Sequence, residues 1–333
     1  MSTQVATFTA QLPLAPVITS QTLSPVAQAA LRGLTAEPRT LPPWLFYDAV
    51  GSALFERITT LPEYYPTRTE RAIFTAHADD IIAAAAGRDV LSIAELGAGT
   101  ASKTGILLAA AVRAQGSVMY CPVDVSATAL ETAKQLEAEL PGVMVEPQVA
   151  DYTSQPIAFD HTAARRLVLY IGSSIGNFTP EDSVRVLRGV RDQLRPGDML
   201  LLGTDMVKDE KKLIAAYDDA AGVTAEFNRN ILHRLNRELG ADFAVDHFSH
   251  CALWNEAESR MEMHLISDVA QRVVIPSLGC DLRFTAGDSI HTENSYKFTQ
   301  KSITWLLKQS GFALQQQWMD AKEWFAVNLA VAV

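Results

Sequence analysis

Short apolar runs alternate with helix-like segments between residues 90 and 203, and this alternation restricts the possible folds more than any other feature of the sequence. Strands that alternate with helices at such spacing are typical of a parallel, doubly wound sheet. The predicted strands are 90–96, 118–125, 143–149, 166–171 and 199–203, and the predicted helices between them are 103–114, 127–140 and 180–194. The predicted fold class is therefore α/β.

The pattern changes after residue 205. Residues 206–240 are predicted to be mostly helical, and residues 243–290 alternate in polarity as antiparallel strands do. Near the C-terminus the sequence predicts a helix capped by Thr299 and then two strands, at 301–309, 312–318 and 324–333. A helix followed by a terminal hairpin is how a class I, Rossmann-like methyltransferase sheet ends, whereas dinucleotide-binding folds usually end in parallel strands.

These patterns divide the chain into two domains and a tail. We expect a methyltransferase-type domain from 70–205 with 297–333, and a smaller α+β substrate-binding domain from 20–69 with 206–296. Residues 1–19 are rich in Thr, Gln and Pro without periodicity, and we expect a flexible tail. Thr67 and Glu70 have the spacing of a capping box, which predicts that a helix begins there.

Charge and cysteine content limit the ligand class and the compartment. The net charge is −10 and no Lys/Arg run exceeds a pair or triplet, which disfavours nucleic acid because its binders need concentrated basic groups. Cys121, Cys251 and Cys280 form no CxxC motif, as is typical of a reducing cytosol. No signal peptide and no apolar run of about 18 residues is present. We expect a cytoplasmic monomer that acts on a small molecule and makes no membrane contact.

A turn with two glycines, Gly97 and Gly99, joins the first predicted strand to the helix after it. Ligands of doubly wound sheets bind at such turns, where glycine lets the backbone approach closely. The Gly-x-Gly pair alone is a weak signal, since many strand–helix turns use glycine for geometry only. Ser102 stands where the dinucleotide fingerprint requires a third glycine, so that fingerprint is incomplete.

Acidic residues at the ends of the next two strands sharpen this interpretation. Asp124 ends the second strand, where a carboxylate reaches both hydroxyls of a ribose. Asp151 and Tyr152 end the third strand, where an acid and an aromatic ring can hold an adenine. Together these residues favour S-adenosylmethionine (SAM) over NAD as the cofactor. Lys103, at the start of the first helix, either meets the carboxylate of that ligand or is a solvated surface lysine.

Two other groups of polar residues carry weaker signals. Asn177 follows the fourth strand, where it either meets a zwitterionic amino acid or is a turn asparagine bonded to the backbone. His247, His250, Cys251 and His264 suggest a metal site, but His247 and His250 on one strand would point to opposite faces. We therefore interpret them as scattered strand residues and expect no metal cofactor.

Longer strings of residues resemble one known family. These strings are Leu41 to Pro43, Phe46 to Asp48, Leu61 to Arg68, Glu95 to Thr100, Gly172 to Asn177, Leu202 to Lys208, Ala216 to Asp219, Thr224 to Asn230 and Thr292 to Phe298. They resemble the histidine Nα-methyltransferases of ergothioneine biosynthesis. The resemblance runs from about residue 38 to the end of the chain, and the first 35 or so residues carry none of it.

The resemblance implies roles for individual residues. In the family, the residue at Tyr47 lies by the substrate amine, and those at Asn177 and Tyr217 hold the carboxylate. The imidazole end would be lined by Tyr64, Met263, Glu293 and Ser295, and SAM would be held by Gly97, Lys103, Asp124 and Asp151. Glu293 suits an imidazole because a carboxylate accepts the ring N–H, and it also favours the imidazolium form, while Ser295 can donate or accept. Tyr152 stands where the family pattern has phenylalanine, a departure that leaves stacking intact.

The sequence therefore predicts an L-histidine Nα-methyltransferase. SAM would trimethylate the α-amino group of free histidine to give histidine betaine (hercynine), with Tyr47 as the catalytic residue that orients the amine. Related enzymes methylate tryptophan derivatives, so an enzyme for tryptophan or a modified tryptophan is the first alternative, although Glu293 and Met263 favour histidine. The second alternative is a non-catalytic sensor of SAM or an amino acid, which intact Tyr47, Asn177 and Glu293 disfavour.

Overall fold

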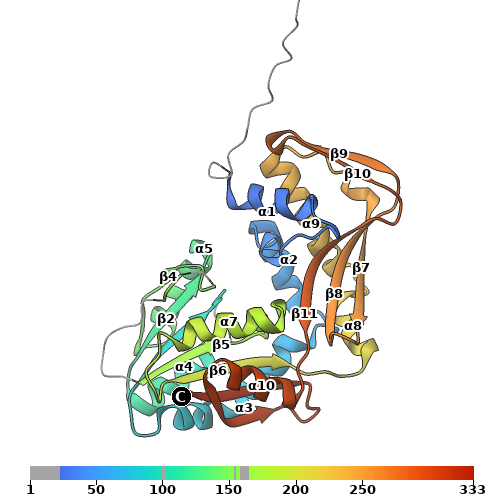
Figure 1. Cartoon of the computed structure of the whole chain (residues 1–333). Helices are drawn as coiled ribbons and strands as arrows, with labels where there is room; N and C mark the ends of the chain where they lie inside the picture. Colours follow the sequence, from blue (N-terminus) through green and yellow to red (C-terminus); the bar gives the residue numbers. More distant parts are fainter. Residues whose placement is uncertain (1–22, 100–102, 154, 158–164) are drawn as a thin grey trace, which may run out of the picture.

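The predicted doubly wound sheet is present. The computed structural model describes residues 23–99, 103–153, 155–157 and 165–333 (Figure 1). Eight strands in these ranges form one sheet in the order β12-β13-β6-β5-β1-β2-β3, and β4 also pairs with β2. They are β1 (Leu91–Leu96), β2 (Val118–Asp124), β3 (Val143–Val145), β4 (Gln148–Val149), β5 (Arg165–Tyr170), β6 (Met199–Asp205), β12 (Phe312–Met319) and β13 (Phe325–Ala332). All pairs are parallel except those of β13, so the predicted α/β class with a terminal hairpin is confirmed.

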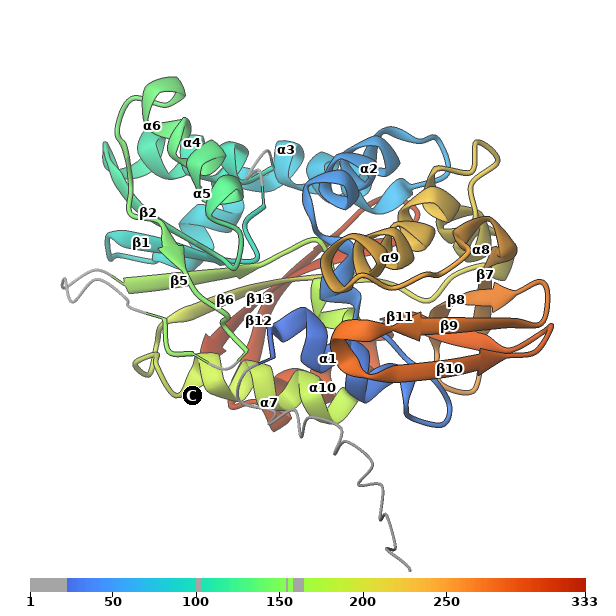
Figure 2. The same ribbon diagram turned by 90° about the horizontal axis from the view of Figure 1, so that it is seen from above.

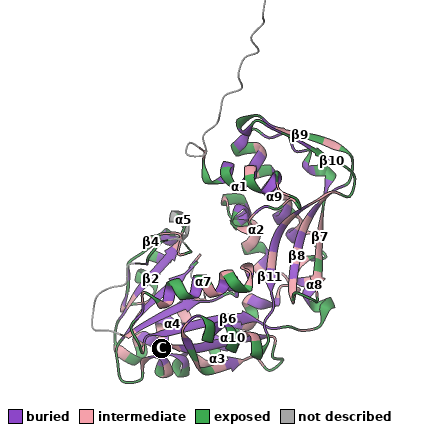
Figure 3. Cartoon of the chain, viewed as in Figure 1, coloured by how far each residue is buried: buried purple, intermediate pink, exposed green. Residues whose placement is uncertain are grey.

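Helices cover both faces of this sheet (Figure 2). One face carries α3 (Tyr65–Ala86), α4 (Thr104–Gln115), α5 (Ala127–Lys134) and α6 (Leu136–Glu139), and the other carries α7 (Pro180–Arg191) and α10 (Gln300–Gln309). The central strands therefore feed two cores: Ile93 and Leu167 point into the first, and Ala94 and Val168 into the second. Because both faces are covered, these strands are buried along their length (Figure 3) and read as continuous apolar runs.

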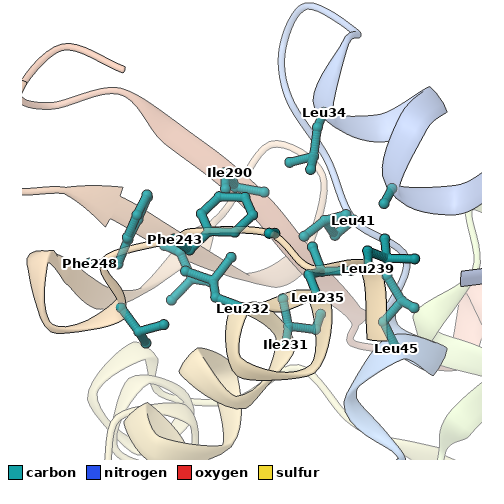
Figure 4. Packing of buried hydrophobic residues seen from close by; sticks show 14 of the residues in the cluster. Leu34, Leu41, Leu45, Ile231, Leu232, Leu235, Leu239, Phe243, Phe248 and Ile290 are labelled. Carbon is teal, nitrogen blue, oxygen red and sulfur yellow. The ribbon is translucent and has the colours of Figure 1, made fainter. Parts of the chain in front are cut away.

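A second lobe combines two separate stretches of the chain. Its apolar core joins residues from 26–58 to residues from 223–290; Leu41, Ile231 and Ile290 meet there (Figure 4). The strands β11, β8 and β7 form an antiparallel sheet, and β9 pairs with β10. The elements are α1 (Pro25–Leu34), η2 (Pro43–Phe46), α2 (Ala49–Thr60), α8 (Glu210–Tyr217), α9 (Val223–Leu239), η4 (Val245–His247), β7 (Phe248–Asn255), β8 (Arg260–Ser267), β9 (Gln271–Ile275), η5 (Pro276–Leu278), β10 (Cys280–Phe284) and β11 (Ser289–Tyr296). The domain boundaries drawn from the sequence stay a prediction.

The predicted capping box at Thr67 is wrong. Helix α3 begins at Tyr65 with Pro66 in its first turn, a position where the missing N–H of proline loses no hydrogen bond. Glu70 does not cap the helix. It is fully buried and accepts the N–H of Gly172, in the loop after β5, at 2.9 Å. Glu70 therefore contacts a distant loop of the chain and does not cap the start of the helix.

Two predicted elements are interrupted. The strand expected over 143–149 is divided into β3 and β4 around Pro147, because proline has no N–H to give to a sheet. The helix expected over 127–140 breaks at Gln135 into α5 and α6. The predicted tail, residues 1–19, lies outside the described residues. Within the described ranges, no helix is both long and apolar enough to cross a membrane.

Candidate active site

The glycine turn after β1 leaves open space in front of its backbone. Gly97 and Gly99 both have positive φ, 65° and 51°, which glycine adopts without strain. Among the residues that the structure describes, none lies within 4 Å of where a Cβ on Gly99 would stand. The N–H of Gly99 donates to Asp124 Oδ2 at 3.1 Å, so the acid at the end of β2 is tied to this turn. The turn lies at the carboxyl end of the parallel strands, where such sheets bind ligands. Thr100 to Ser102 lie outside the described residues.

The buried carboxyl of Glu95 holds the same turn in place through hydrogen bonds. Glu95, near the end of β1, accepts hydrogen bonds from Thr104 Oγ1 at 2.7 Å and from the hydroxyl of Tyr120. Burial raises the pKa of Glu95 to about 7. Because Thr104 is the first residue of α4, the carboxyl joins both sides of the turn and fixes its shape.

Tyr152 completes the cofactor side. Its hydroxyl lies 3.6 Å from where a Cβ on Gly97 would stand and 3.3 Å from the hydroxyl of Tyr170. Asp151 precedes it and accepts the N–H of Thr153 at 2.9 Å. The structure thus brings Gly97, Gly99, Asp124 and Tyr152 together at one end of the sheet, with Asp151 beside them. An open glycine turn flanked by acids and an aromatic ring fits the ribose and adenine of a nucleoside ligand.

Lys103 is not the solvated surface lysine that we considered. Its ammonium forms an ion pair with the fully buried Glu70 and lies 3.5 Å from where a Cβ on Gly172 would stand. Glu70 in turn accepts the N–H of Gly172. This pair therefore joins α3, the start of α4 and the loop after β5. Glu70 was not predicted as a site residue because its spacing from Thr67 indicated a helix cap.

Aromatic rings form one wall on the substrate side. Tyr47 follows η2 and packs edge-on against Phe55 and Phe227, with ring centroids 5.6 and 5.8 Å apart. Tyr64, just before α3, packs edge-on against Phe55 at 6.1 Å. Loss of hydration and then the nearby Glu293 carboxyl raise the pKa of Tyr47 well above its ordinary value. Its hydroxyl therefore stays protonated at neutral pH.

Glu293 is a buried carboxyl without a partner. It lies on β11, is 9% exposed, and its side chain forms no hydrogen bond with any residue that the structure describes. Its oxygens are not fully enclosed and keep a small solvent-accessible area. Burial raises the pKa of Glu293 to about 7, against the opposing effect of Lys297. Register shifts between His291 and Glu293, and such irregularities re-aim side chains at functional sites.

Tyr217 and Ser295 meet beside Glu293. The Tyr217 hydroxyl donates to Ser295 Oγ at 2.7 Å, and the ammonium of Lys297 donates to both hydroxyl oxygens at 2.7 and 2.8 Å. The carbonyl of Tyr217, at the end of α8, accepts from His250 Nε2 at 2.8 Å. Neither Lys297 nor His250 was predicted at this site. Each is a single polar residue on or beside a strand, and only the tertiary structure gives it a partner.

Asn177 is the last residue of η3 (Ser174–Asn177). Its side chain forms no hydrogen bond with the residues that the structure describes, so the alternative of a turn asparagine held by the backbone is wrong. The preceding Gly176 packs so closely on β11 that a Cβ there would lie 2.7 Å from the carbonyl oxygen of Tyr296. This contact holds the partly buried Asn177 amide next to the strand that carries Glu293 and Ser295, where it is available to a ligand.

The histidines do not form the group that we considered for a metal. His250 Nδ1 accepts from Asn228 at 2.8 Å, and burial lowers the pKa of His250, so it is a neutral structural residue. His264 instead lies near Glu262 and His291, with ligand atoms within 4.8 Å of one another. The Glu262 carboxylate is already held by neighbouring polar groups, Arg260 at 2.8 Å and Asn255 at 2.9 Å. This arrangement therefore does not favour a metal ion, and the absence of a metal cofactor stays a prediction.

Known proteins resemble this chain over most of its length. A family model described as "Histidine-specific methyltransferase, SAM-dependent" matches residues 26–332. The histidine N-alpha-methyltransferase of Mycolicibacterium smegmatis is 47% identical over 90% of this chain and 92% of its own. The protein of the same name from Mycobacterium tuberculosis is 44% identical over the same shares. Ergothioneine biosynthesis protein 1 of Neurospora crassa is 34% identical over 61% of this chain and 23% of its own.

Proposed function

The chain belongs to the family of histidine-specific, SAM-dependent methyltransferases, and we propose that it transfers methyl groups from SAM to the α-amino nitrogen of free L-histidine. Three successive transfers give histidine betaine (hercynine), a step of ergothioneine biosynthesis. The names of the mycobacterial relatives support the substrate and the position of the methyl groups, and the name of the fungal relative supports the pathway.

The unpaired carboxyl of Glu293 is the observation that most favours histidine as the substrate. A buried carboxylate without a donor is unfavourable unless a ligand supplies one, and the N–H of an imidazole does so. Met263 lies directly across from Glu293 on β8 and fills the same face of the sheet, which leaves less room for an indole. Phenylalanine would leave the carboxylate desolvated and unpaired, and sites built for hydrogen bonding reject such analogues strongly.

The residues of the chain align the amine and exclude water. SAM, when bound, supplies an electrophilic methyl group on its sulfonium. Tyr47, with its raised pKa, keeps its hydroxyl proton and therefore orients the amine without serving as a base. The α-amino group of free histidine is mostly protonated at neutral pH and reacts in its neutral form, so its proton leaves to water before the transfer. Alignment of the reacting atoms then supplies most of the catalysis.

Aromatic rings accommodate the cationic products. Each methyl transfer to the neutral amine gives an ammonium, which loses a proton to water before the next transfer, and the third transfer leaves a permanent ammonium. The rings of Tyr47, Phe55 and Tyr64 lie within 6.1 Å of one another in successive pairs and would line the site of that nitrogen. A cation near such rings is stabilised by about 0.5–2 kcal/mol. This wall supports three transfers at one site.

The open turn after β1 would hold SAM. Asp124 would bond the ribose, Asp151 and Tyr152 the adenine, and Lys103 the carboxylate, while Gly97 and Gly99 admit the ligand to the backbone. The free thiols of Cys121, Cys251 and Cys280 are consistent with a cytoplasmic location, which we include in the proposal. That the protein is a monomer stays a prediction for size-exclusion chromatography.

A competition assay tests the proposed substrate. The protein is incubated with SAM and an equimolar mixture of all twenty amino acids, and the products are followed by mass spectrometry. We expect methylated histidine as the main product. Methylated tryptophan as the main product would instead favour the first alternative, and tight SAM binding without any methylated product would favour a sensor.

A further inference from the structure

A buried lysine stands behind the candidate substrate site. Lys297, which follows β11, is 4% exposed. Its ammonium contacts three oxygens: Asp205 Oδ2 at 2.8 Å, Tyr217 Oη at 2.7 Å and Ser295 Oγ at 2.8 Å. An ammonium has three N–H groups and no acceptor, so all of its hydrogen-bonding capacity is used. Asp205 ends β6, and Lys297 therefore joins the large sheet to the second lobe.

Lys297 restricts the bonds that Tyr217 and Ser295 can form. Each hydroxyl oxygen accepts one proton from the lysine, and Ser295 Oγ also accepts the Tyr217 proton at 2.7 Å. Both lone pairs of the serine oxygen are then occupied. Because Tyr217 donates to Ser295, the hydroxyl proton left over for a ligand is that of Ser295, and the one free lone pair of the two hydroxyls is on Tyr217 Oη. Ser295 therefore presents a donor and no free acceptor.

We propose that Lys297 is a positioning residue that makes Ser295 a proton donor, so that the site binds the neutral imidazole of histidine. This inference rests on the proposed function. In it, Glu293 accepts the single N–H of the ring, and Ser295 donates to the other ring nitrogen; the carboxylate role that the resemblance implies for Tyr217 stays a prediction. An imidazolium has two N–H groups, and one of them would face a donor. From the sequence alone, Ser295 was free to donate or accept; Lys297 removes that freedom.

The charges around the pair act in opposite directions. The groups that face it are Glu293 on β11, Asp205 on β6, Lys208 after β6, Tyr47 after η2, and Tyr64 and Tyr65 at the start of α3. Glu293 attracts an imidazolium, whereas the two lysines repel it. The tyrosines are neutral because the ordinary pKa of a tyrosine is about 10 and loss of hydration raises it further, although Tyr47 itself is 43% exposed. Lys297 thus opposes the protonated ring both by its charge and by filling an acceptor of Ser295.

Lys208 offers a matched control. It forms an ion pair with the same Asp205 and donates to the Tyr65 hydroxyl at 2.7 Å, but it has no bond to Tyr217 or Ser295. Lys208→Met therefore removes a buried cation from the same carboxylate and leaves the hydroxyl pair as it is. Lys297→Met removes a cation of the same kind and also frees an acceptor on each hydroxyl. In both variants Asp205 keeps one lysine and the Tyr65 hydroxyl.

The protonation state of each ring nitrogen can be measured by nuclear magnetic resonance. Ring-¹⁵N-labelled histidine is bound to the protein together with S-adenosylhomocysteine. In the wild-type protein we expect a neutral ring in a single tautomer at about pH 8, where free histidine exchanges between both tautomers. In Lys297→Met the apparent pKa of the bound ring should rise by about 1, and in Lys208→Met by clearly less.

A doubly protonated ring in the wild-type protein at about pH 8 would overturn the inference, and this measurement needs no variant to fold. Equal pKa changes in the two lysine variants would also overturn it, because charge alone would then explain the effect. Both results leave the proposed function intact. If the wild-type protein binds no histidine at all, the proposed function fails and this inference fails with it.

Discussion

Glu293 and Met263 are directly opposed partners in the β8–β11 pair, so their side chains lie on the same face of that sheet. Met263 is 1% exposed and packs in the core of the second lobe, whereas the Glu293 carboxyl has no partner among the described residues. One end of the candidate substrate site therefore has the buried side chain of Met263 as an apolar boundary and the Glu293 carboxyl as a hydrogen-bond acceptor without a donor. This relationship is the basis of the first two predictions.

Removal of the acceptor should weaken recognition of histidine. We expect Glu293→Ala to lower kcat/KM for histidine at least tenfold, which is about 1.4 kcal/mol and corresponds to one charge-assisted hydrogen bond. Glu293→Gln keeps the size and one acceptor oxygen, and should lose less. Steady-state kinetics with histidine, phenylalanine and tryptophan measures both. If Glu293→Ala keeps the wild-type preference for histidine, this residue does not read the imidazole.

More space opposite Glu293 should admit a larger ring. In the Glu293→Ala background, Met263→Val should raise the turnover of tryptophan relative to histidine, because it shortens the side chain that bounds the pocket. Leu265→Val is the control: Leu265 is equally buried on the same face of β8 and in the same core, but it lies opposite Ile290, which is not a residue of the candidate site. A similar change in the tryptophan to histidine ratio from both variants would show that the effect is not local.

The buried carboxyl should reduce stability at high pH. The pKa of Glu293 rises from 4.5 to about 7 on folding, so the folded state holds this proton more tightly than the unfolded state. The favourable contribution is complete below the unfolded pKa and is lost as pH rises through the folded pKa. Glu293→Gln should therefore gain up to about 3 kcal/mol relative to wild type at about pH 8, compared with about pH 4. Urea unfolding at both pH values measures this gain, and a difference independent of pH would show that ionisation of Glu293 is not its cause.

Asp124 should contribute to SAM binding. We expect Asp124→Ala to weaken SAM binding by about 1.5–3 kcal/mol, the range for hydrogen bonds to a charged group. Asp124→Asn keeps one oxygen that can accept the Gly99 N–H, so it separates loss of the ribose contact from loss of the turn. Isothermal calorimetry with SAM and with NAD measures both effects. Unchanged affinity would remove Asp124 from the ribose site, and NAD binding as tight as SAM binding would contradict the cofactor.

Asn177 should anchor the substrate in the ground state and the transition state alike. Asn177→Ala removes an amide that has no other partner in the described part of the chain, so it should chiefly raise the KM for histidine and leave kcat nearly unchanged. Steady-state kinetics with saturating SAM measures both constants. A large loss in kcat at constant KM would instead assign Asn177 to the transition state.

The parts of the fold that were predictable from sequence are those set by local patterns. Central strands such as β1 and β5 are apolar along their length because both faces are covered, and Thr299 caps α10 with the expected reciprocal hydrogen bonds. Local signals misled where a distant partner took the residue. Glu70 has the spacing of a capping residue, but Lys103 and Gly172 occupy its carboxylate.

The same limit applies to the candidate site. The residues of the candidate substrate site were identified from the sequence strings that resemble the family. The structure brings five of them close enough to interact electrostatically or by hydrogen bonds: Tyr47, Tyr64, Tyr217, Glu293 and Ser295. Lys297 and Asp205 were not singled out. A single charged residue in a largely apolar segment indicates that it is buried with a partner of opposite charge. Only the tertiary structure, in which the end of β6 meets the residue after β11, shows that Asp205 is the partner of Lys297.

The position of the transferred methyl groups decides whether the site works as proposed. Histidine is incubated with SAM that carries a ¹³C-labelled methyl group, and the product is analysed by fragment mass spectrometry and by ¹³C resonance. We expect histidine to gain up to three labelled methyl groups, all on the α-nitrogen and none on the ring. A labelled methyl group on either imidazole nitrogen would contradict the proposal, because Glu293 and Ser295 would then not hold the ring away from the methyl donor.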